Sequence, residues 1–166
     1  ALPLARGGRL ALVGPLGHDR IDMQGTWAID ADPRHSVTLL EGLRAVAGPG
    51  TEIRHALGCP IVDDPDIAAR LNIHNPAMPS VPPETRGAEE LMAEARAAAE
   101  WADAIVLALG EAKEHAGESS TRLDIGLPGR QAARGTEVAA VARARGGRPG
   151  EGGLSGRALA PGQGGR

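Results

Sequence analysis

Residues 110–131, "GEAKEHAGESSTRLDIGLPGRQ", bring together many side chains that could transfer protons or bind charge. The segment holds four carboxylates, one histidine and two arginines, and its glycines work against a long helix. Glu111, Glu114 and Glu118 are spaced i, i+3 and i+7, so on a helix they would form one acidic, solvated face. The residues alone therefore leave two interpretations open: a charged surface segment, or a loop that holds one carboxylate for proton transfer.

Residues typical of metal and cofactor sites are scattered along the chain. The five histidines show no HxH or HExxH spacing, and Cys59 is the single cysteine, so we expect no zinc site and no internal disulfide. We interpret Cys59 as a small buried apolar residue. No GxGxxG motif follows an apolar run, which argues against a flavodoxin-like or dinucleotide-binding domain. The sequence predicts no metal and no cofactor.

Two apolar runs are expected to form strands that position the charged segment. "RLALVG" (9–14) and "DAIVLALG" (103–110) lack polar alternation, which is typical of strands covered on both faces, and "TEIRHAL" from Thr51 predicts a weaker strand. In open α/β sheets, ligands bind at loops that leave the carboxyl ends of strands. Residues 14–27 and 110–131 follow two of the expected strands, so both loops are candidates for a site.

Two helices are expected between these strands. In "SVTLLEGLRAVAGPG" (36–50), Ser36 can cap a helix that Gly48 and Pro49 end. Its apolar face would contain Leu39, Leu40, Leu43, Val46 and Ala47. A second helix is predicted from about Ala88 to Ala102, with an apolar stripe of Leu91, Met92, Ala95, Ala98, Ala99 and Ala102. The Pro-rich residues 75–85 are predicted to form an extended surface connection.

The order of these elements predicts an α/β domain with a mostly parallel sheet flanked by helices. The net charge of −3 and the absence of a basic run with aromatics argue against a nucleic-acid partner. No apolar stretch approaches the roughly 20 residues needed to span a membrane, and the first residues lack the features of an export signal. We therefore expect a soluble domain with no membrane partner.

The composition changes after Gln131, where most residues are Gly, Ala or Arg. We predict a folded domain over 1–131 and a largely disordered tail over 132–166, in which "TEVAAVARAR" could form a short helix. Such a switch is also what a GC-rich gene yields when it is read out of frame. We hypothesise a frameshifted tail.

From Leu2 to Gln131 the sequence resembles the C-terminal α/β sandwich domain of glycoside hydrolase family 3, in the branch of periplasmic bacterial β-glucosidases. The resemblance rests on several motifs in order: "LPL" (2–4), "LALVGPL" (10–16), "DMQGTW" (22–27), "SVTLLEGLRA" (36–45), "ALGC" (56–59), "ADAIVLALGE" (102–111) and "GESSTRLDIGLPGRQ" (117–131). It implies a fragment of a retaining exo-β-glycosidase that acts on β-linked glucosides or oligosaccharides, in the periplasm or secreted.

In that family, an N-terminal (β/α)8-type barrel carries the aspartate nucleophile, and the sandwich domain lends a loop with the acid/base glutamate. The match places this role on Glu118 of "GESSTR". Arg122 and Asp124 match the following "SR.D" stretch and could orient the loop through an ion pair or contact sugar. Glu111 is expected to anchor the loop or to contact substrate, and Trp27 to line the sugar cleft or to pack between loop and domain.

The family match leaves half of the catalytic pair unaccounted for, because no barrel and no nucleophile are found in this sequence. We therefore expect the chain to be inactive alone and to require a barrel as its partner. The alternative is a carbohydrate-binding or interaction domain without catalytic activity. An upstream reading frame that encodes a family 3 barrel would favour the enzyme fragment.

Overall fold

The fold is that of a computed structural model, which describes residues 4, 7–28, 30, 32–73, 77, 79–116 and 120–144. Within these residues, three parallel strands form one sheet: β1 (Gly8–Val13), β2 (Thr51–Ala56) and β3 (Ala104–Leu107), in the order β2-β1-β3. Leu10 of β1 lies opposite Ile53 and Ala104. The sheet confirms the predicted α/β class with parallel strands, although β3 is shorter than the expected 103–110.

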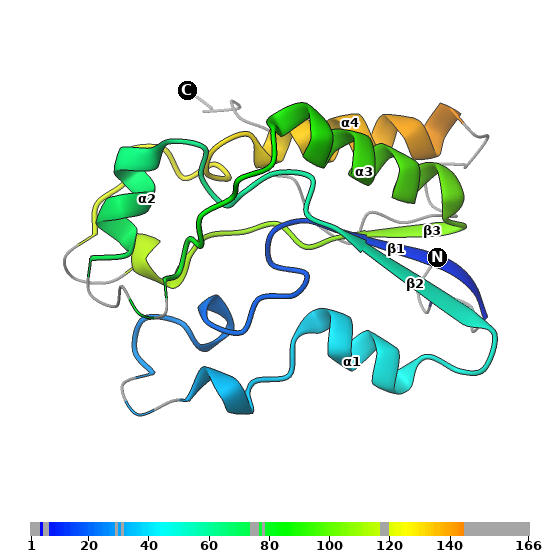
Figure 1. The fold of residues 1–166 in the computed structure, drawn as a ribbon, viewed down its shortest axis with the longest axis horizontal. Helices are drawn as coiled ribbons and strands as arrows, with labels where there is room; N and C mark the ends of the chain where they lie inside the picture. Colours follow the sequence, from blue (N-terminus) through cyan, green and yellow to red (C-terminus); the bar gives the residue numbers. More distant parts are fainter. Residues whose placement is uncertain are drawn as a thin grey trace, which may run out of the picture.

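Helices cover both faces of this sheet. Helices α3 (Ala88–Trp101) and α4 (Gln131–Ala144) lie on one face, and α1 (Leu39–Val46) lies on the other (Figure 1). The central strand β1 is buried between these layers, with Ala11 and Leu12 fully inaccessible and Val13 nearly so. An apolar run without alternation is what such a position requires.

Helix α3 contributes the largest described part of the core. All six residues of its predicted apolar stripe are buried, and Met92 with the four alanines packs against Ala11, Val13 and Ala56 of the sheet and Val138 of α4. Because four of the six are alanines, the helix can lie close to the strands, and Gly58 comes near enough that a Cβ there would lie 3.5 Å from Cβ of Ala95. The core therefore depends on small side chains at close range.

Helix α1 differs from the prediction in its cap and in its apolar face. Thr38, not Ser36, is the N-cap: its hydroxyl accepts from the Glu41 N–H at 3.2 Å, and the Glu41 carboxylate accepts from the Thr38 N–H at 2.9 Å. Leu40 is buried and Leu43 partly so, whereas Leu39 and Val46 are 39 % and 76 % exposed. A helix of eight residues turns only a narrow stripe toward the sheet, so the predicted five-residue face is wrong.

Helix α2 (Pro65–Leu71) was not predicted, although its sequence carries a start signal. The carboxylate of Asp64 caps it by accepting from the Asp66 and Ile67 N–H groups at 2.9 and 3.1 Å, and Pro65 occupies the first helical position. Asn72 follows the helix and pairs through its amide with both backbone groups of Val81, at 2.7 and 2.9 Å. Val81 and Ser80 are consequently buried, so the Pro-rich connection is not wholly on the surface.

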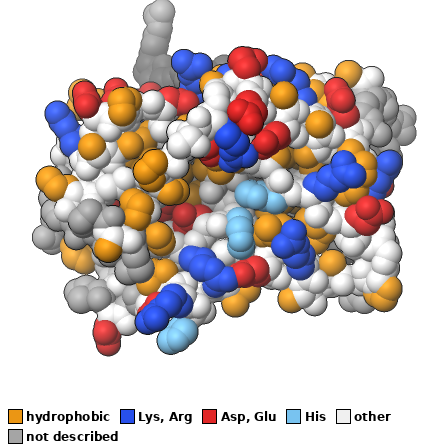
Figure 2. Space-filling view, in the orientation of Figure 1, with side chains coloured by type: hydrophobic (Ala, Val, Ile, Leu, Met, Phe, Trp, Pro, Cys, Tyr) orange, Lys and Arg blue, Asp and Glu red, His pale blue; other side chains and the backbone are white. Residues whose placement is uncertain are grey.

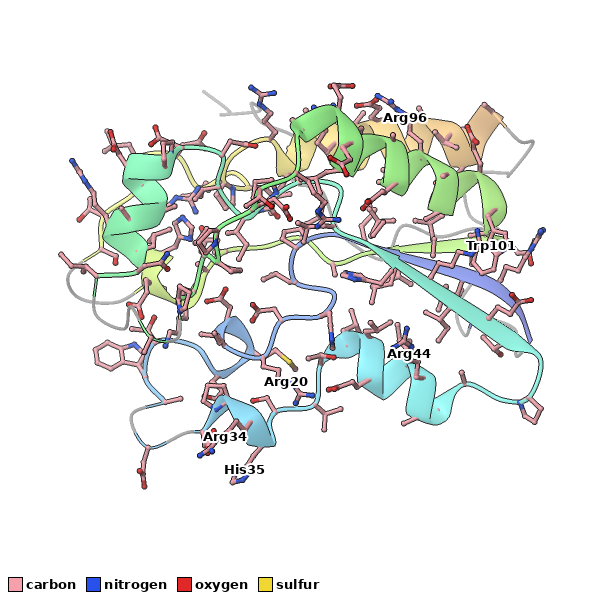
Figure 3. All side chains as sticks on the ribbon, viewed as in Figure 1. Arg20, Arg34, His35, Arg44, Arg96 and Trp101 are labelled. Carbon is pink, nitrogen blue, oxygen red and sulfur yellow. The ribbon has the colours of Figure 1, made fainter. Side chains whose placement is uncertain are left out.

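Helix α4 begins at Gln131, earlier than the expected "TEVAAVARAR" helix, and it packs against α3. Val138 joins the core, and Arg96 of α3 forms an ion pair with Glu137 of α4 (Figure 3). Helix α4 thus extends past the predicted boundary after residue 131, with core contacts at Val138 and Val141 and its end at Ala144. The remainder of the predicted tail, residues 145–166, lies outside the described residues. Among the described helices, none has the length and apolar character needed to cross a membrane.

Candidate functional site

The loops that follow β1 and β3 begin side by side at the carboxyl end of the sheet. The Leu16 N–H donates to the Ala108 carbonyl at 3.2 Å, and a Cβ on Gly14 would lie 2.2 Å from the same oxygen. Gly14 also has a φ of +134°, so a larger residue would be strained there as well as blocked. The two candidate loops are thus in contact from their first residues.

The first loop is held against α1. The Arg20 side chain donates to the Ser36 carbonyl and forms an ion pair with Glu41 (Figure 3). A short 3-10 helix, η1 (Asp22–Gln24), follows, and the Gln24 amide donates to the Ser36 hydroxyl at 2.9 Å. These contacts give the first loop a fixed position from which its later side chains reach the second loop.

Asp22 joins the first loop to the second. Its Oδ1 accepts from the Lys113 N–H at 2.8 Å, across 91 residues of sequence, and its own N–H donates to Oδ1 of Asp19 at 2.6 Å. Burial raises the pKa of the Asp22 carboxyl to about 7, and nearby Asp19 adds to the rise, whereas the Lys113 N–H opposes it. The pKa of Asp19 is also raised, again chiefly by burial. The loop junction therefore contains two carboxyl groups that are costly to ionise.

Thr26 makes the next contact between the loops. Its hydroxyl lies within hydrogen-bond reach of the Lys113 carbonyl and of the Ala116 carbonyl, the second at 2.9 Å. Lys113 is the first residue of another 3-10 turn, η3 (Lys113–His115), and Ala116 directly follows that turn. Within it, Nδ1 of His115 accepts from the Ala112 N–H at 3.0 Å, and burial lowers the pKa of that imidazole. The turn that precedes residues 117–119 is therefore held at both of its ends.

Glu118, the predicted acid/base residue, lies outside the described residues, as do its two neighbours. The residues on either side are described. Ala116 is bound by Thr26, and the Ser120 hydroxyl donates to the Glu114 carbonyl at 2.6 Å. Glu114 itself is only 21 % exposed in its side chain and lies 3.7 Å from Nζ of Lys113, so it is not the solvated loop carboxylate of an acidic helix face. The η3 turn ends after three residues, which excludes that face over the described part of the loop.

Arg122 pairs with Glu111 rather than with Asp124, in contrast to the expected ion pair. Its Nη2 also donates to the Gly126 carbonyl at 2.6 Å. Asp124 instead accepts from the Gly126 N–H at 2.7 Å, which turns its carboxylate back onto its own segment. The ion pair of Glu111 with Arg122 joins residues on both sides of 117–119.

Trp27 remains 67 % exposed, so it does not pack between loop and domain. Trp101, the last residue of α3, is instead covered by a side chain of the domain: the Arg54 guanidinium lies 4.0 Å from the centroid of its ring (Figure 3). Met23, Leu123 and Ile125 are also exposed, by 54 %, 102 % and 89 %. Apolar side chains gather on the left of the view in Figure 2, over the end of the molecule where α2 lies. Both candidate loops therefore present large apolar side chains to their surroundings.

Gln131 is the last residue of the "GESSTRLDIGLPGRQ" motif, and no role was predicted for it. It is fully buried at the start of α4; its Oε1 accepts from the Gly110 N–H at 2.9 Å, and its Nε2 donates to the carbonyls of Ile61 and Gly110 at 3.0 and 2.8 Å. One amide thereby joins the exit of β3, the segment after β2 and the start of α4. The sign of this role in the sequence was a glutamine at the first position of a helix whose other buried residues, Gly135, Val138 and Ala139, have no polar side chain.

Over the described part of the chain, no group of three or more His, Cys, Asp or Glu side chains is arranged to hold a metal ion. Cys59 is buried as predicted, and burial raises the pKa of its thiol to about 11. A thiol held neutral in this way is a poor nucleophile.

The profile of the glycosyl hydrolase family 3 C-terminal domain matches residues 1–144. The chain belongs to this family. The match ends at the last residue of α4, in agreement with the extent of the described fold.

The relatives are much longer proteins. A periplasmic β-glucosidase of Salmonella typhimurium is 35 % identical over 127 residues, which is 76 % of this chain but 16 % of the relative. A β-glucosidase of intestinal bacteria involved in saponin metabolism is 28 % identical, with a TM-score of 0.63 over 87 % of this chain and 21 % of its own. A β-glucosidase variant from Listeria innocua, solved in complex with laminaribiose, is 27 % identical, with a TM-score of 0.61 over 84 % of this chain and 16 % of its own. This chain thus corresponds to about a fifth or less of each relative.

Proposed function

We propose that this chain is part of a retaining β-glucosidase and that its second loop supplies the acid/base residue, Glu118, to a barrel domain that carries the nucleophile. The observation that supports this most directly is the anchoring of the loop on both sides of Glu118, by Thr26 at Ala116 and by the Arg122–Glu111 ion pair. A loop that must present one carboxyl group to a sugar needs fixed ends.

The proposed chemistry follows from the two carboxyl groups of a retaining glycosidase, which stand about 5–5.5 Å apart. Glu118, kept protonated by a closed, partly apolar site, donates its proton to the glycosidic oxygen as the bond to the sugar breaks. The barrel aspartate meanwhile forms the glycosyl-enzyme. Glu118 then removes a proton from the water that hydrolyses this intermediate. With one of the two groups, the chain alone does not complete the cycle.

The remaining loop side chains fit contacts to sugar. The exposed indole of Trp27 offers a flat apolar surface to the C–H face of a glucosyl unit. Asp124 keeps one carboxylate oxygen free of the bond to Gly126 and can accept from a sugar hydroxyl. The substrates are β-linked glucosides or oligosaccharides, which agrees with the laminaribiose complex of the Listeria relative. The name of the Salmonella relative supports a periplasmic or secreted location.

A hybrid enzyme tests this proposal. The matching 127-residue segment of the Salmonella periplasmic β-glucosidase is replaced by that of this chain, and hydrolysis of cellobiose and of an activated aryl β-glucoside is measured. Glu118→Ala should lower kcat/KM for cellobiose by about 10²–10⁴-fold, because its leaving group needs protonation. Glycosyl-enzyme formation from the aryl glucoside should be largely spared, and azide should partly restore turnover.

Glu52→Gln is the control, because Glu52 is an exposed carboxylate on β2 at the opposite end of the strand from the loops. It should leave both substrates unaffected. If Glu118→Ala also leaves cellobiose hydrolysis intact, the acid/base assignment is wrong. If a folded hybrid hydrolyses neither substrate while the parent enzyme does, this segment does not supply the function proposed for it. The isolated 166-residue chain should show no turnover.

A further inference from the structure

We propose that Asp22 and Thr26 are positioning residues, which set the placement of the loop that carries Glu118 by capping its η3 turn from the neighbouring loop. This inference rests on the proposed function, because it assigns Asp22 and Thr26 a role in presenting that glutamate. Neither residue is proposed to contact the substrate itself.

The η3 turn cannot cap its own first N–H. Its N-cap residue is Ala112, which has no side-chain oxygen, and the Lys113 N–H that opens the turn points instead to Oδ1 of Asp22 at 2.8 Å. An accepting side-chain oxygen at the start of a helical turn satisfies a donor that has no partner within the turn. Asp22 therefore supplies from 91 residues away what a local Ser or Asp would ordinarily supply.

Thr26 caps the other end of the same turn. Its hydroxyl lies within hydrogen-bond reach of two carbonyls: that of Lys113, the first residue of η3, and that of Ala116, the residue directly after η3. A hydroxyl has one proton to donate, so it serves one carbonyl at a time and holds both close. Together, Asp22 and Thr26 bind η3 at its beginning and at its end, and both come from the segment that contains η1.

This double cap lies next to the proposed catalytic residue. Ala116 precedes Glu118 by two residues in the sequence, so the double cap fixes the chain directly before the proposed acid/base residue. After residues 117–119, the Ser120 hydroxyl donates to the carbonyl of Glu114, which belongs to the same turn. Releasing η3 would therefore loosen both described flanks of the loop, Ala116 and Ser120. A displacement of about 1 Å at a catalytic group can cost on the order of 10²-fold in rate.

The burial of Asp22 is a further sign that the contact has a purpose other than stability. Its Oδ2 is buried and has no hydrogen-bond partner of ordinary geometry among the described residues, although the Ser80 hydroxyl lies near enough to influence the group. A buried carboxyl oxygen without a good partner costs free energy. Retaining an aspartate at this position is easier to understand if its other oxygen places Lys113.

Amide hydrogen exchange on the full 166-residue chain tests the contact itself. Thr26→Val keeps the shape of the side chain and removes the hydroxyl, and it should speed exchange at His115 and Ala116 about tenfold, whereas Thr26→Ser should restore protection. Asp22→Ala should speed exchange at Lys113 by a similar factor, and Asp22→Asn, which keeps the accepting oxygen, should not. Unchanged exchange at these amides in both Thr26→Val and Asp22→Ala would overturn the proposal.

Thr136→Val is the matched control, because Thr136 also donates its hydroxyl to a backbone carbonyl, that of Ala132 at 2.9 Å, but on the exposed side of α4. It should leave exchange in residues 112–116 unchanged. Should Thr26→Val lower Tm far more than this control, the comparison of Asp22→Ala with Asp22→Asn decides the question alone.

Kinetics of the hybrid enzyme separate this inference from the proposed function. Thr26→Val should lower kcat for cellobiose about tenfold or more, with KM little changed and with a smaller effect on the activated aryl glucoside, and Thr26→Ser should recover most of it. If Glu118→Ala cripples the hybrid and Thr26→Val does not, positioning is refuted and the function stands. If Glu118→Ala is harmless, both fall.

Discussion

The helix layer over the sheet and the loop junction at its carboxyl end are held together in different ways. The α3 layer consists of buried apolar residues, and Met92 and Ala95 at its centre are fully inaccessible. The loop junction relies on hydrogen bonds of Asp22, Thr26 and Gln131 to backbone groups of distant segments. Apolar packing is non-directional and tolerates small shifts, whereas a hydrogen bond fixes two atoms to within a few tenths of an ångström. The buried residues of α3 therefore contribute most to the stability of the fold, and the hydrogen bonds of the loops fix the positions of particular backbone groups.

The largest effect on stability is expected from Met92→Ala in the helix layer. Met92 is fully buried among alanines, which cannot expand to fill the space, so the change should lower the free energy of unfolding by about 2–5 kcal/mol. Urea unfolding followed by circular dichroism measures this loss. Met23→Ala in η1 is the matched control, since that side chain is 54 % exposed, and it should change stability by less than about 0.5 kcal/mol. If both variants lost the same free energy of unfolding, the proposed difference between the helix layer and the loops would be wrong.

An intermediate effect is expected from Gln131→Met, which keeps the size of the side chain and removes its polar atoms. The Gly110 N–H and the carbonyls of Ile61 and Gly110 would lose their partner in a buried place, at a cost of about 1–3 kcal/mol. Gln24→Met, at a partly buried amide that bonds only the Ser36 hydroxyl among the described contacts, should cost less than about 1 kcal/mol. A neutral Gln131→Met would show that apolar packing, not the amide, joins α4 to β3.

A pH-dependent effect is expected from Asp22. Its pKa is raised from 3.8 to about 7 in the folded chain, so between these values the folded state binds more protons than the unfolded state. The contribution of Asp22 to stability is therefore present at acidic pH and falls as pH rises from about 4 to about 7. Unfolding of wild type and Asp22→Asn at pH 5 and pH 8 measures it, with the variant gaining relative to wild type at pH 8.

The comparison with Asp22→Asn is needed because other groups titrate in the same range. Burial lowers the pKa of His55 and His115, which makes the folded state lose stability as pH falls below about 6.5 and so opposes the effect of Asp22. These histidines are common to both proteins and cancel in the difference. A difference between the two proteins that is independent of pH would contradict the raised pKa of Asp22.

Relations within one element were predictable from the sequence. The spacing of Leu91, Met92 and Ala95 placed one face of α3 in the core, and the apolar run at 9–14 identified the central strand. Errors arose where several local choices were equivalent. Ser36 and Thr38 are both good N-caps, and the packing of Leu40 on the sheet selects Thr38. The start of α4 was missed because its composition lacks an apolar stripe, and Gln131 is fixed by contacts with distant segments.

By itself, the sequence determined the α/β class, the family and the loop that carries the candidate carboxylate, because helix and strand periodicity and short motifs are local properties of the chain. The assignment of Glu118 stays a prediction. Only the tertiary structure decided that Arg122 pairs with Glu111, that Asp22 and Thr26 cap η3, and that Trp27 remains exposed. Such partners are separated by up to 91 residues, and which side chain meets which backbone group depends on the path of the whole chain around the sheet.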